Sequence, residues 1–116
     1  MNLRRLWWGV LMGASVPAFA ADWHALTGAY AVTAEHYLDP APDEPANSHF
    51  RLQLSDAAAK DLYLAIPGEP EVDACTGGLA KTVGELQCVF LQAGPRYQCA
   101  FSIDLRDGSV SYGVAC

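Results

Sequence analysis

The chain has 116 residues, with seven Lys or Arg, thirteen Asp or Glu and a formal net charge of −6. A chain of this length fits a single domain. Its excess of acidic residues argues against nucleic-acid binding and against docking on anionic lipid, because both require clustered cations.

The first twenty residues predict a cleaved secretory signal peptide. Arg4 and Arg5 give a positive start, LWWGVLMGASV is a short apolar run, and AFA at 18–20 is a small-x-small cleavage site. The apolar run is too short to span a membrane. We therefore expect a periplasmic or secreted domain over residues 21–116, not inserted into a membrane, with five basic and thirteen acidic residues and a net charge of −8.

Two strands are predicted at the start of this domain, over residues 28–38 (GAYAVTAEHYL) and 49–54 (HFRLQL). Apolar and polar side chains alternate along both, as they do in strands with one buried face. The first strand would turn Tyr30, Val32 and Ala34 to the core. The second would turn Phe50, Leu52 and Leu54 inward and His49, Arg51 and Gln53 to solvent.

A short helix is predicted next, over residues 56–65. Ser55 is a candidate N-cap, and Pro67 ends the segment because the residue before a proline avoids helical angles. The side chains expected to pack on the sheet follow helical spacing: Ala58, Leu62, Ala65 and Ile66.

Two acidic, proline-rich segments flank this strand and helix, residues 39–48 (DPAPDEPANS) and 67–75 (PGEPEVDAC). If the helix returns alongside the second strand, both segments lie at one end of the domain. They would concentrate six carboxylates there: Asp39, Asp43, Glu44, Glu69, Glu71 and Asp73. Such a cluster attracts a cationic protein surface. The alternative is that the segments are only solvated. Calcium is disfavoured, because no calcium-loop spacing occurs.

A three-strand meander is predicted at the C-terminal end, over residues 86–92, 99–106 and 109–116. Asp-Gly at 107–108 between alternating runs is a two-residue hairpin signal, which pairs residues whose numbers sum to 215. The turn before it would set Phe90 against Cys99 and Cys88 against Phe101. Four side chains of the middle strand would point to water: Ala100, Ser102, Asp104 and Arg106.

The complete prediction is an α+β domain of order β-β-α-β-β-β. It consists of a five-stranded antiparallel sheet with one helix packed on its apolar face. No internal repeat and no second domain are expected.

The four cysteines predict two disulfides in an exported chain. The hairpin register places Cys99 opposite Cys116 at a non-hydrogen-bonded pair, where Cα atoms approach to about 4.5 Å. We therefore predict Cys99–Cys116 and, with it, Cys75–Cys88. The alternative is Cys88–Cys99 with Cys75–Cys116. The wide, irregular spacings without a C-x-x-C pair argue against zinc, and no metal or cofactor is predicted.

No catalytic motif stands out in the sequence. His24, His36 and His49 are scattered, and no nucleophile elbow occurs. We therefore expect a non-catalytic, monomeric binding protein that recognises and neutralises a basic protein partner, as hydrolase inhibitors and immunity proteins do. This expectation rests on analogy of size, charge and compartment. The alternatives are an envelope-associated structural protein and a carboxylate-dependent hydrolase of cell-wall or sugar substrates.

Overall fold

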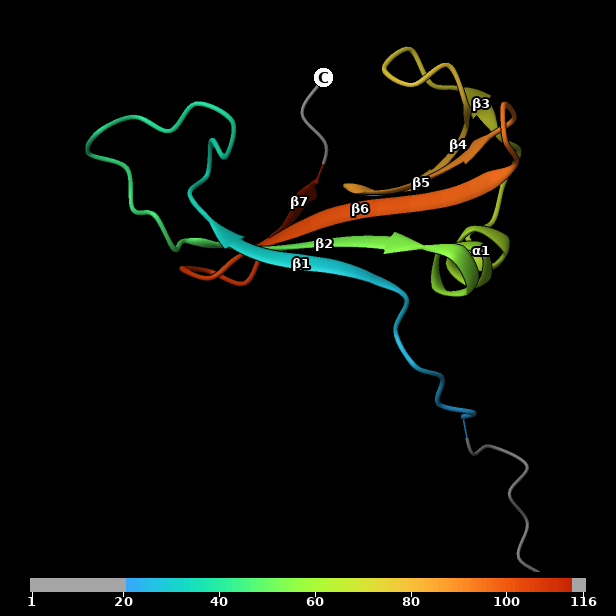
Figure 1. Cartoon of the computed structure of the whole chain (residues 1–116), viewed down its shortest axis with the longest axis horizontal. Coiled ribbons are helices and arrows are strands. Elements are labelled where there is room, and N and C mark those ends of the chain that lie inside the picture. The colour runs from blue at the N-terminus through green and yellow to red at the C-terminus, as the bar shows by residue number, and fades with distance from the viewer. Residues whose placement is uncertain (1–20, 114–116) are drawn as a thin grey trace, which may run out of the picture.

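The structure is a computed structural model that describes residues 21–113. It confirms the α+β class: one helix and a seven-stranded antiparallel sheet of order β1-β2-β6-β5-β4-β3, with β7 paired to β6 (Figure 1). The elements are β1 Gly28–Thr33, β2 His49–Ser55, α1 Asp56–Ala65, β3 Glu71–Val72, β4 Leu79–Val83, β5 Leu86–Leu91, β6 Arg96–Asp104 and β7 Val110–Tyr112. Among the described residues, no helix is long and apolar enough to cross a membrane.

The predicted count of five strands is wrong because β3 and β4 were not anticipated. β4 forms a hairpin with β5 in which Val83 pairs with Leu86 across the two-residue turn Gly84-Glu85. Gly84 has φ 57°, a left-handed conformation that glycine adopts without steric cost. β3 adds two further residues to the edge of β4.

Both predicted registers in the C-terminal meander are displaced by two residues. Phe101 pairs with Tyr112 rather than Val114, and Cys88 pairs with Cys99 rather than Phe101. The β6–β7 turn is wider than the Asp-Gly pair, because the Asp104 N–H donates to the Ser109 carbonyl at 2.8 Å. A displacement of two residues preserves which side chains share a face, whereas a displacement of one would exchange the faces.

The corrected register determines the disulfide. Cys88 and Cys99 lie opposite each other with Cα atoms 4.1 Å apart and are bonded to each other. The predicted Cys99–Cys116 and Cys75–Cys88 bridges are therefore wrong, and the Cys88–Cys99 alternative is confirmed. Cys75 is also disulfide-bonded, and Cys116 lies outside the described residues.

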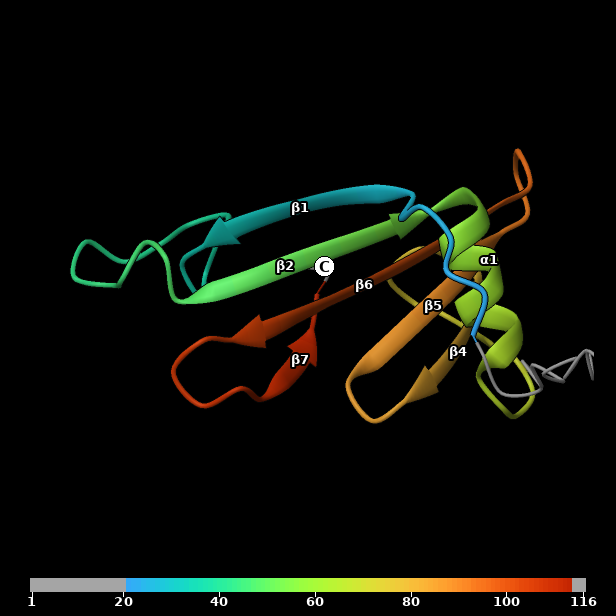
Figure 2. The same ribbon diagram turned by 90° about the horizontal axis from the view of Figure 1, so that it is seen from below.

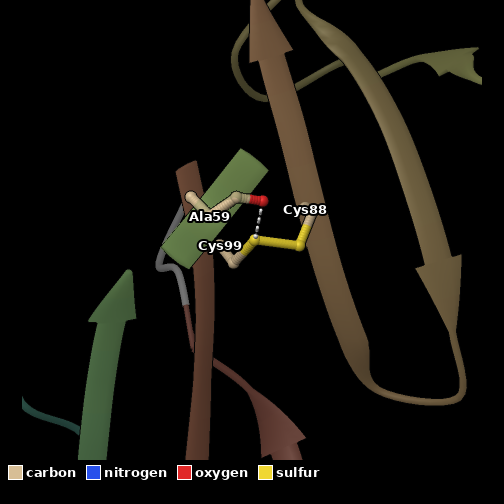
Figure 3. The surroundings of a disulfide bond; sticks show 3 residues. All are labelled: Ala59, Cys88 and Cys99. Carbon is tan, nitrogen blue, oxygen red and sulfur yellow. Dashed lines mark hydrogen bonds between the residues drawn. A yellow bond between two sulfur atoms is a disulfide. The ribbon is translucent and has the colours of Figure 1, made fainter. Parts of the chain in front are cut away.

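The helix has the predicted bounds but a different orientation. It crosses the strands at one end of the sheet instead of returning along β2 (Figures 1 and 2). It lies over the disulfide, where the Ala59 carbonyl oxygen contacts Cys99 Sγ at 3.5 Å (Figure 3). The core consists of buried Ala59, Tyr63, Ile66, Cys88 and Cys99, with partly buried Leu54, Leu62, Phe90 and Tyr97 packed against them.

The helix buries only part of the predicted stripe, since Ile66 is buried and Leu62 packs against the core as expected. Ala59, Tyr63 and Ile66 face the sheet, whereas Ala65 is exposed and Ala58 is only half-buried. Ser55 occupies the N-cap position, yet its side chain makes no capping hydrogen bond. Thr27 takes that role from outside the helix, because its Oγ1 accepts the Ala58 N–H at 3.0 Å.

We expected one apolar face of the sheet, covered by the helix, and one solvated face. Neither face matches that expectation fully. Because α1 covers only one end, Tyr30 and Val32 on the helix-bearing face remain 72% and 51% exposed. On the opposite face, Ala100 and Ser102 are buried, which corrects the prediction that they point to water. This opposite face is concave, since β4, β3 and residues 73–78 rise above it (Figure 1).

Candidate functional site

The structure does not gather the six predicted partner-binding carboxylates at one end. Glu69, Glu71 and Asp73 line one groove beside β3 and β4. The loop that carries Asp39, Asp43 and Glu44 lies at the far end of β2 from α1 (Figures 1 and 2). The expected single cluster depended on the helix returning along β2, and the crossing orientation of α1 separates the two groups instead.

In the first group, Glu44 organises the loop between β1 and β2. Its carboxylate contacts His36 Nδ1 at 2.7 Å and accepts backbone N–H groups of His36 and Ala41 at 3.2 and 3.1 Å. Desolvation raises the pKa of Glu44, but these hydrogen bonds outweigh it and lower the pKa overall. Asp39 and Asp43 are exposed, so they are the carboxylates of this group that face solvent.

The same loop brings potential metal ligands together. Ligand atoms of Glu35, His36 and Glu44 lie within 4.8 Å of one another. An imidazole and two carboxylates suit a divalent ion. However, Glu44 already accepts two backbone hydrogen bonds, and exposed acidic groups are common without an ion. We assign no metal site to these residues.

In the second group, Asp73 shapes a tight turn. Its Oδ2 accepts the hydroxyl of Thr76 at 2.7 Å and the Thr76 N–H at 3.0 Å. The hydroxyl hydrogen bond is the main reason that the pKa of Asp73 is lowered. Glu69 and Glu71 are exposed beside it. The turn thus holds one ionised carboxylate in place next to two solvated ones.

Cavities on the concave face connect the two groups. A central cavity of about 470 Å³ adjoins a second that is lined by Glu35 and Asp39, and a third that is lined by Asp73 and Glu85. Tyr112 lines all three, and we call the three cavities together the concave trough. Burial, together with the nearby charge of Asp73, raises the pKa of Tyr112. The trough therefore has carboxylates at both ends, and Arg51, His36 and His49 also line the end beside Asp39.

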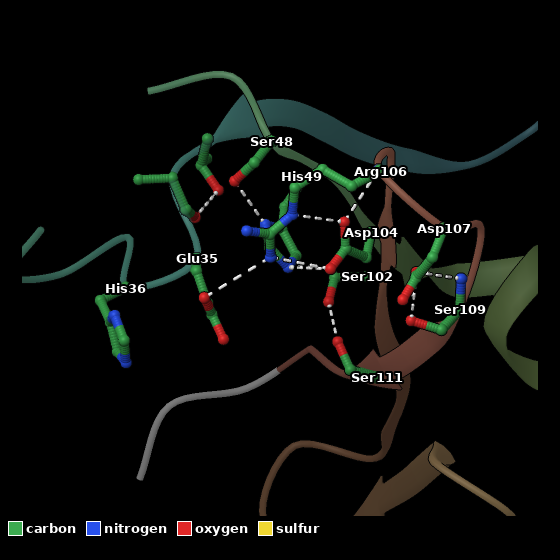
Figure 4. A network of polar contacts seen from close by, with 12 residues as sticks. Glu35, His36, Ser48, His49, Ser102, Asp104, Arg106, Asp107, Ser109 and Ser111 are labelled. Carbon is green, nitrogen blue, oxygen red and sulfur yellow. Dashed lines mark hydrogen bonds and ion pairs between the residues drawn. The ribbon is translucent and has the colours of Figure 1, made fainter. Parts of the chain in front are cut away.

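A buried polar network borders the trough (Figure 4). His49, which was predicted to face solvent, is only 4% exposed. Its Nδ1 lies 2.8 Å from Ser48 Oγ, and its Nε2 lies 3.8 Å from Asp104 Oδ2. These are the residue types of a hydrolase triad, but Ser48 is itself buried, and the Asp104 carboxylate is bound by Arg106. A nucleophile must be reachable by substrate, so the network is better explained as a structural link between β2 and the β6–β7 turn.

The contacts between Asp104 and Arg106 predict the pH range in which ionised Asp104 stabilises the fold. Arg106 donates to Asp104 from Nε at 3.0 Å, from a terminal nitrogen at 2.9 Å and from its backbone N–H at 2.9 Å. These hydrogen bonds lower the pKa of Asp104 to about 2. Because the folded-state pKa lies below the ordinary value of about 3.9, the stabilisation is complete above pH ~4 and is lost as the pH falls towards about 2.

Replacing Arg106 with Gln should move the pKa of Asp104 back towards its ordinary value. Carboxyl ¹³C NMR titration would measure this. Asp107 is the internal control, because the backbone and hydroxyl of Ser109 lower its pKa more than Arg106 does. An unchanged titration of Asp104 in the variant would show that the guanidinium is not the cause.

Comparison with known proteins found no match for this chain among protein-family models, curated proteins or solved structures.

Proposed function

We propose that this protein is a non-catalytic, exported binding protein that recognises and neutralises a basic protein partner. The observation that supports the proposal is the charge distribution of the concave trough. Asp39 and Glu35 border one end, Asp73 and Glu85 border the other, and the groove of Glu69 and Glu71 continues from Asp73. A basic protein segment laid along the trough would meet carboxylates at both ends.

Three of the five basic residues of the domain lie near these carboxylates: Arg51 and Lys81 line the acidic cavities, and Arg106 pairs with Glu35 at 3.6 Å, but each is also held by other contacts. Arg51 donates to Thr33 Oγ1 at 2.8 Å and lies over the ring of Tyr37. Lys81 donates to the Ile66 carbonyl at 3.2 Å, and Arg106 is held by Asp104. Within residues 21–113, no ion pair is found for Asp39, Asp43, Glu69 or Glu71.

Exposed charges of one sign act mainly on the rate of encounter. They steer an oppositely charged partner and can raise association rates by orders of magnitude at low salt, an effect that screening removes. The partner-binding role therefore predicts fast, salt-sensitive association. The anchoring contacts that slow dissociation would come from the more enclosed part of the trough around Tyr112.

The test reverses charge inside and outside the trough by the same amount. The first variant carries Asp39→Lys and Glu85→Lys, one at each end of the trough. The control carries Asp22→Lys and Asp61→Lys, which are outside the residues that line the trough. Surface plasmon resonance would measure association with a cationic hydrolase, such as a lysozyme, and with basic proteins of the producing cell's envelope.

At low salt, we expect the first variant to associate at least tenfold more slowly than the wild type. The association rate of the control should change by less than threefold. At high salt, the association rates of the wild type and the first variant should become similar. Equal losses in the two variants would indicate a general charge effect and would remove the trough from the proposal. The absence of any salt-sensitive basic partner would count against the function itself.

A further inference from the structure

The central cavity of the concave trough differs chemically from its acidic ends. None of its described lining residues is Asp, Glu, Lys, Arg or His. Its polar side chains are neutral: Gln53, Ser55, Thr76, Gln87, Gln98 and Tyr112. Three of the four glutamines in the chain therefore line one cavity of about 470 Å³, a volume within the range of small-molecule sites.

The strand register explains why a hollow forms here. Ala100 of β6 lies between Gln53 of β2 and Gln87 of β5. Gln98, two residues along the same strand, lies between Ser55 and Val89. Side chains two apart on a strand share a face, so long amides surround the small side chain of Ala100. The result is an apolar floor with amide walls.

One amide in this wall lacks a hydrogen-bond partner. Gln87 Oε1 is buried and has no partner among the described residues. The same side chain lies beside Asp73 and contributes to the lowered pKa of that carboxylate. A carboxylate only accepts, so the amide nitrogen must point to Asp73 and the carbonyl oxygen is the unpaired atom. An unpaired buried acceptor is costly. A rotation of this side chain that turned Oε1 towards the cavity would let a bound O–H or N–H donor relieve that cost.

We propose that this central cavity binds a neutral saccharide unit. Each sugar hydroxyl both donates and accepts, and each glutamine amide offers both roles in return. The apolar floor and the ring of Tyr112 suit the C–H surfaces of a sugar ring. A charged ligand would lose solvation in the cavity and find no opposite charge among its described lining residues. The cavity lies between the acidic ends of the trough, so a saccharide bound there would compete with the anchoring contacts proposed around Tyr112 for the basic partner.

The experiment follows glutamine side-chain amides by ¹⁵N NMR on the mature domain. Neutral oligosaccharides, chitotetraose and maltotetraose, are the probes. We expect saturable shifts of the Gln53, Gln87 and Gln98 amides with one of them. Gln92 is the control, because it is exposed in the β5–β6 turn and does not line the cavity. Gln98→Ala, at an exposed position, should weaken binding at least fivefold, and Gln92→Ala should leave it unchanged.

Gln87→Met removes the unpaired acceptor and should also weaken binding at least fivefold. Two further probes distinguish the ligand class: a lysine-rich peptide and an uncharged, blocked dipeptide. Saturable shifts of the three amides with either peptide, and not with the sugars, would overturn the proposal. The absence of saturable shifts with both sugars would overturn it as well. Neither result depends on whether the charge-reversal experiment succeeds.

Discussion

Replacing Tyr63 with alanine is expected to lower the free energy of unfolding by about 4 kcal/mol. Tyr63 is 6% exposed and packs on Tyr97 with ring centroids 5.2 Å apart. Lys81 Nζ lies 4.9 Å from the centre of its ring on another side. Truncation would leave a cavity beside the disulfide, because Tyr63 has the largest side chain in the buried core cluster. Urea unfolding followed by circular dichroism would measure the change.

The control for this prediction is Leu64→Ala. Leu64 is the next residue on α1 but is 59% exposed, so its removal should change stability by less than about 0.5 kcal/mol. Leu62→Asp should also prevent stable folding, since Leu62 packs against the core cluster. If Leu64→Ala proved as damaging as Tyr63→Ala, the helix would have to be rotated about its axis from the orientation described.

The sequence of α1 does not determine which side of the helix faces the sheet. Ala58, Leu62 and Ile66 form a helical stripe, and so do Ala59, Tyr63 and Ile66. Alanine and leucine occur on several sides of this short helix, so local periodicity favours neither stripe strongly. The choice depends on how the chain enters the helix, where Asp56 has φ 47° and Thr27 binds the first turn. Both are tertiary features.

The strands show which part of a sheet is encoded locally. The alternation of apolar and polar residues predicted which side chains of β5, β6 and β7 share a face. These faces are unchanged by a register displacement of two residues. The β6–β7 register was predicted from the Asp-Gly turn rule, and a long-range contact overrides that rule. The Leu105 N–H donates to the Ser48 carbonyl at 2.8 Å, and the wider turn holds it in position. Short-range patterns contain no information about that partner.

The site was predictable by residue type but not by arrangement. The acidic segments were identified from composition, yet their separation follows from the direction of α1. The central cavity was not anticipated, because Gln53, Gln87 and Gln98 come from three strands and meet only in the correct register. The available signal was that Gln53 alternates with the inward-facing leucines of β2, and that Gln87 and Gln98 flank cysteines in the same way.

Replacing both Cys88 and Cys99 with alanine is expected to lower the free energy of unfolding by about 3 kcal/mol. The bridge spans 11 residues, and closing a loop of this size restricts the unfolded chain by about that amount. Both cysteines are almost fully buried under Ala59, so the loss of packing adds to the effect. The measurement is urea unfolding of the oxidised wild type and the double variant under the same conditions.

Peptide mapping without reduction tests the pairing independently of stability. Trypsin cuts after Lys81, Arg96 and Arg106, which puts Cys88 in the peptide 82–96 and Cys99 in the peptide 97–106. The Cys88–Cys99 bond predicts that these two peptides are released as one linked species. A link between 97–106 and 107–116 would instead restore the Cys99–Cys116 pairing and the two-residue hairpin. It would also separate Cys88 from Cys99 across β5 and β6 and displace the glutamines of the central cavity from one another.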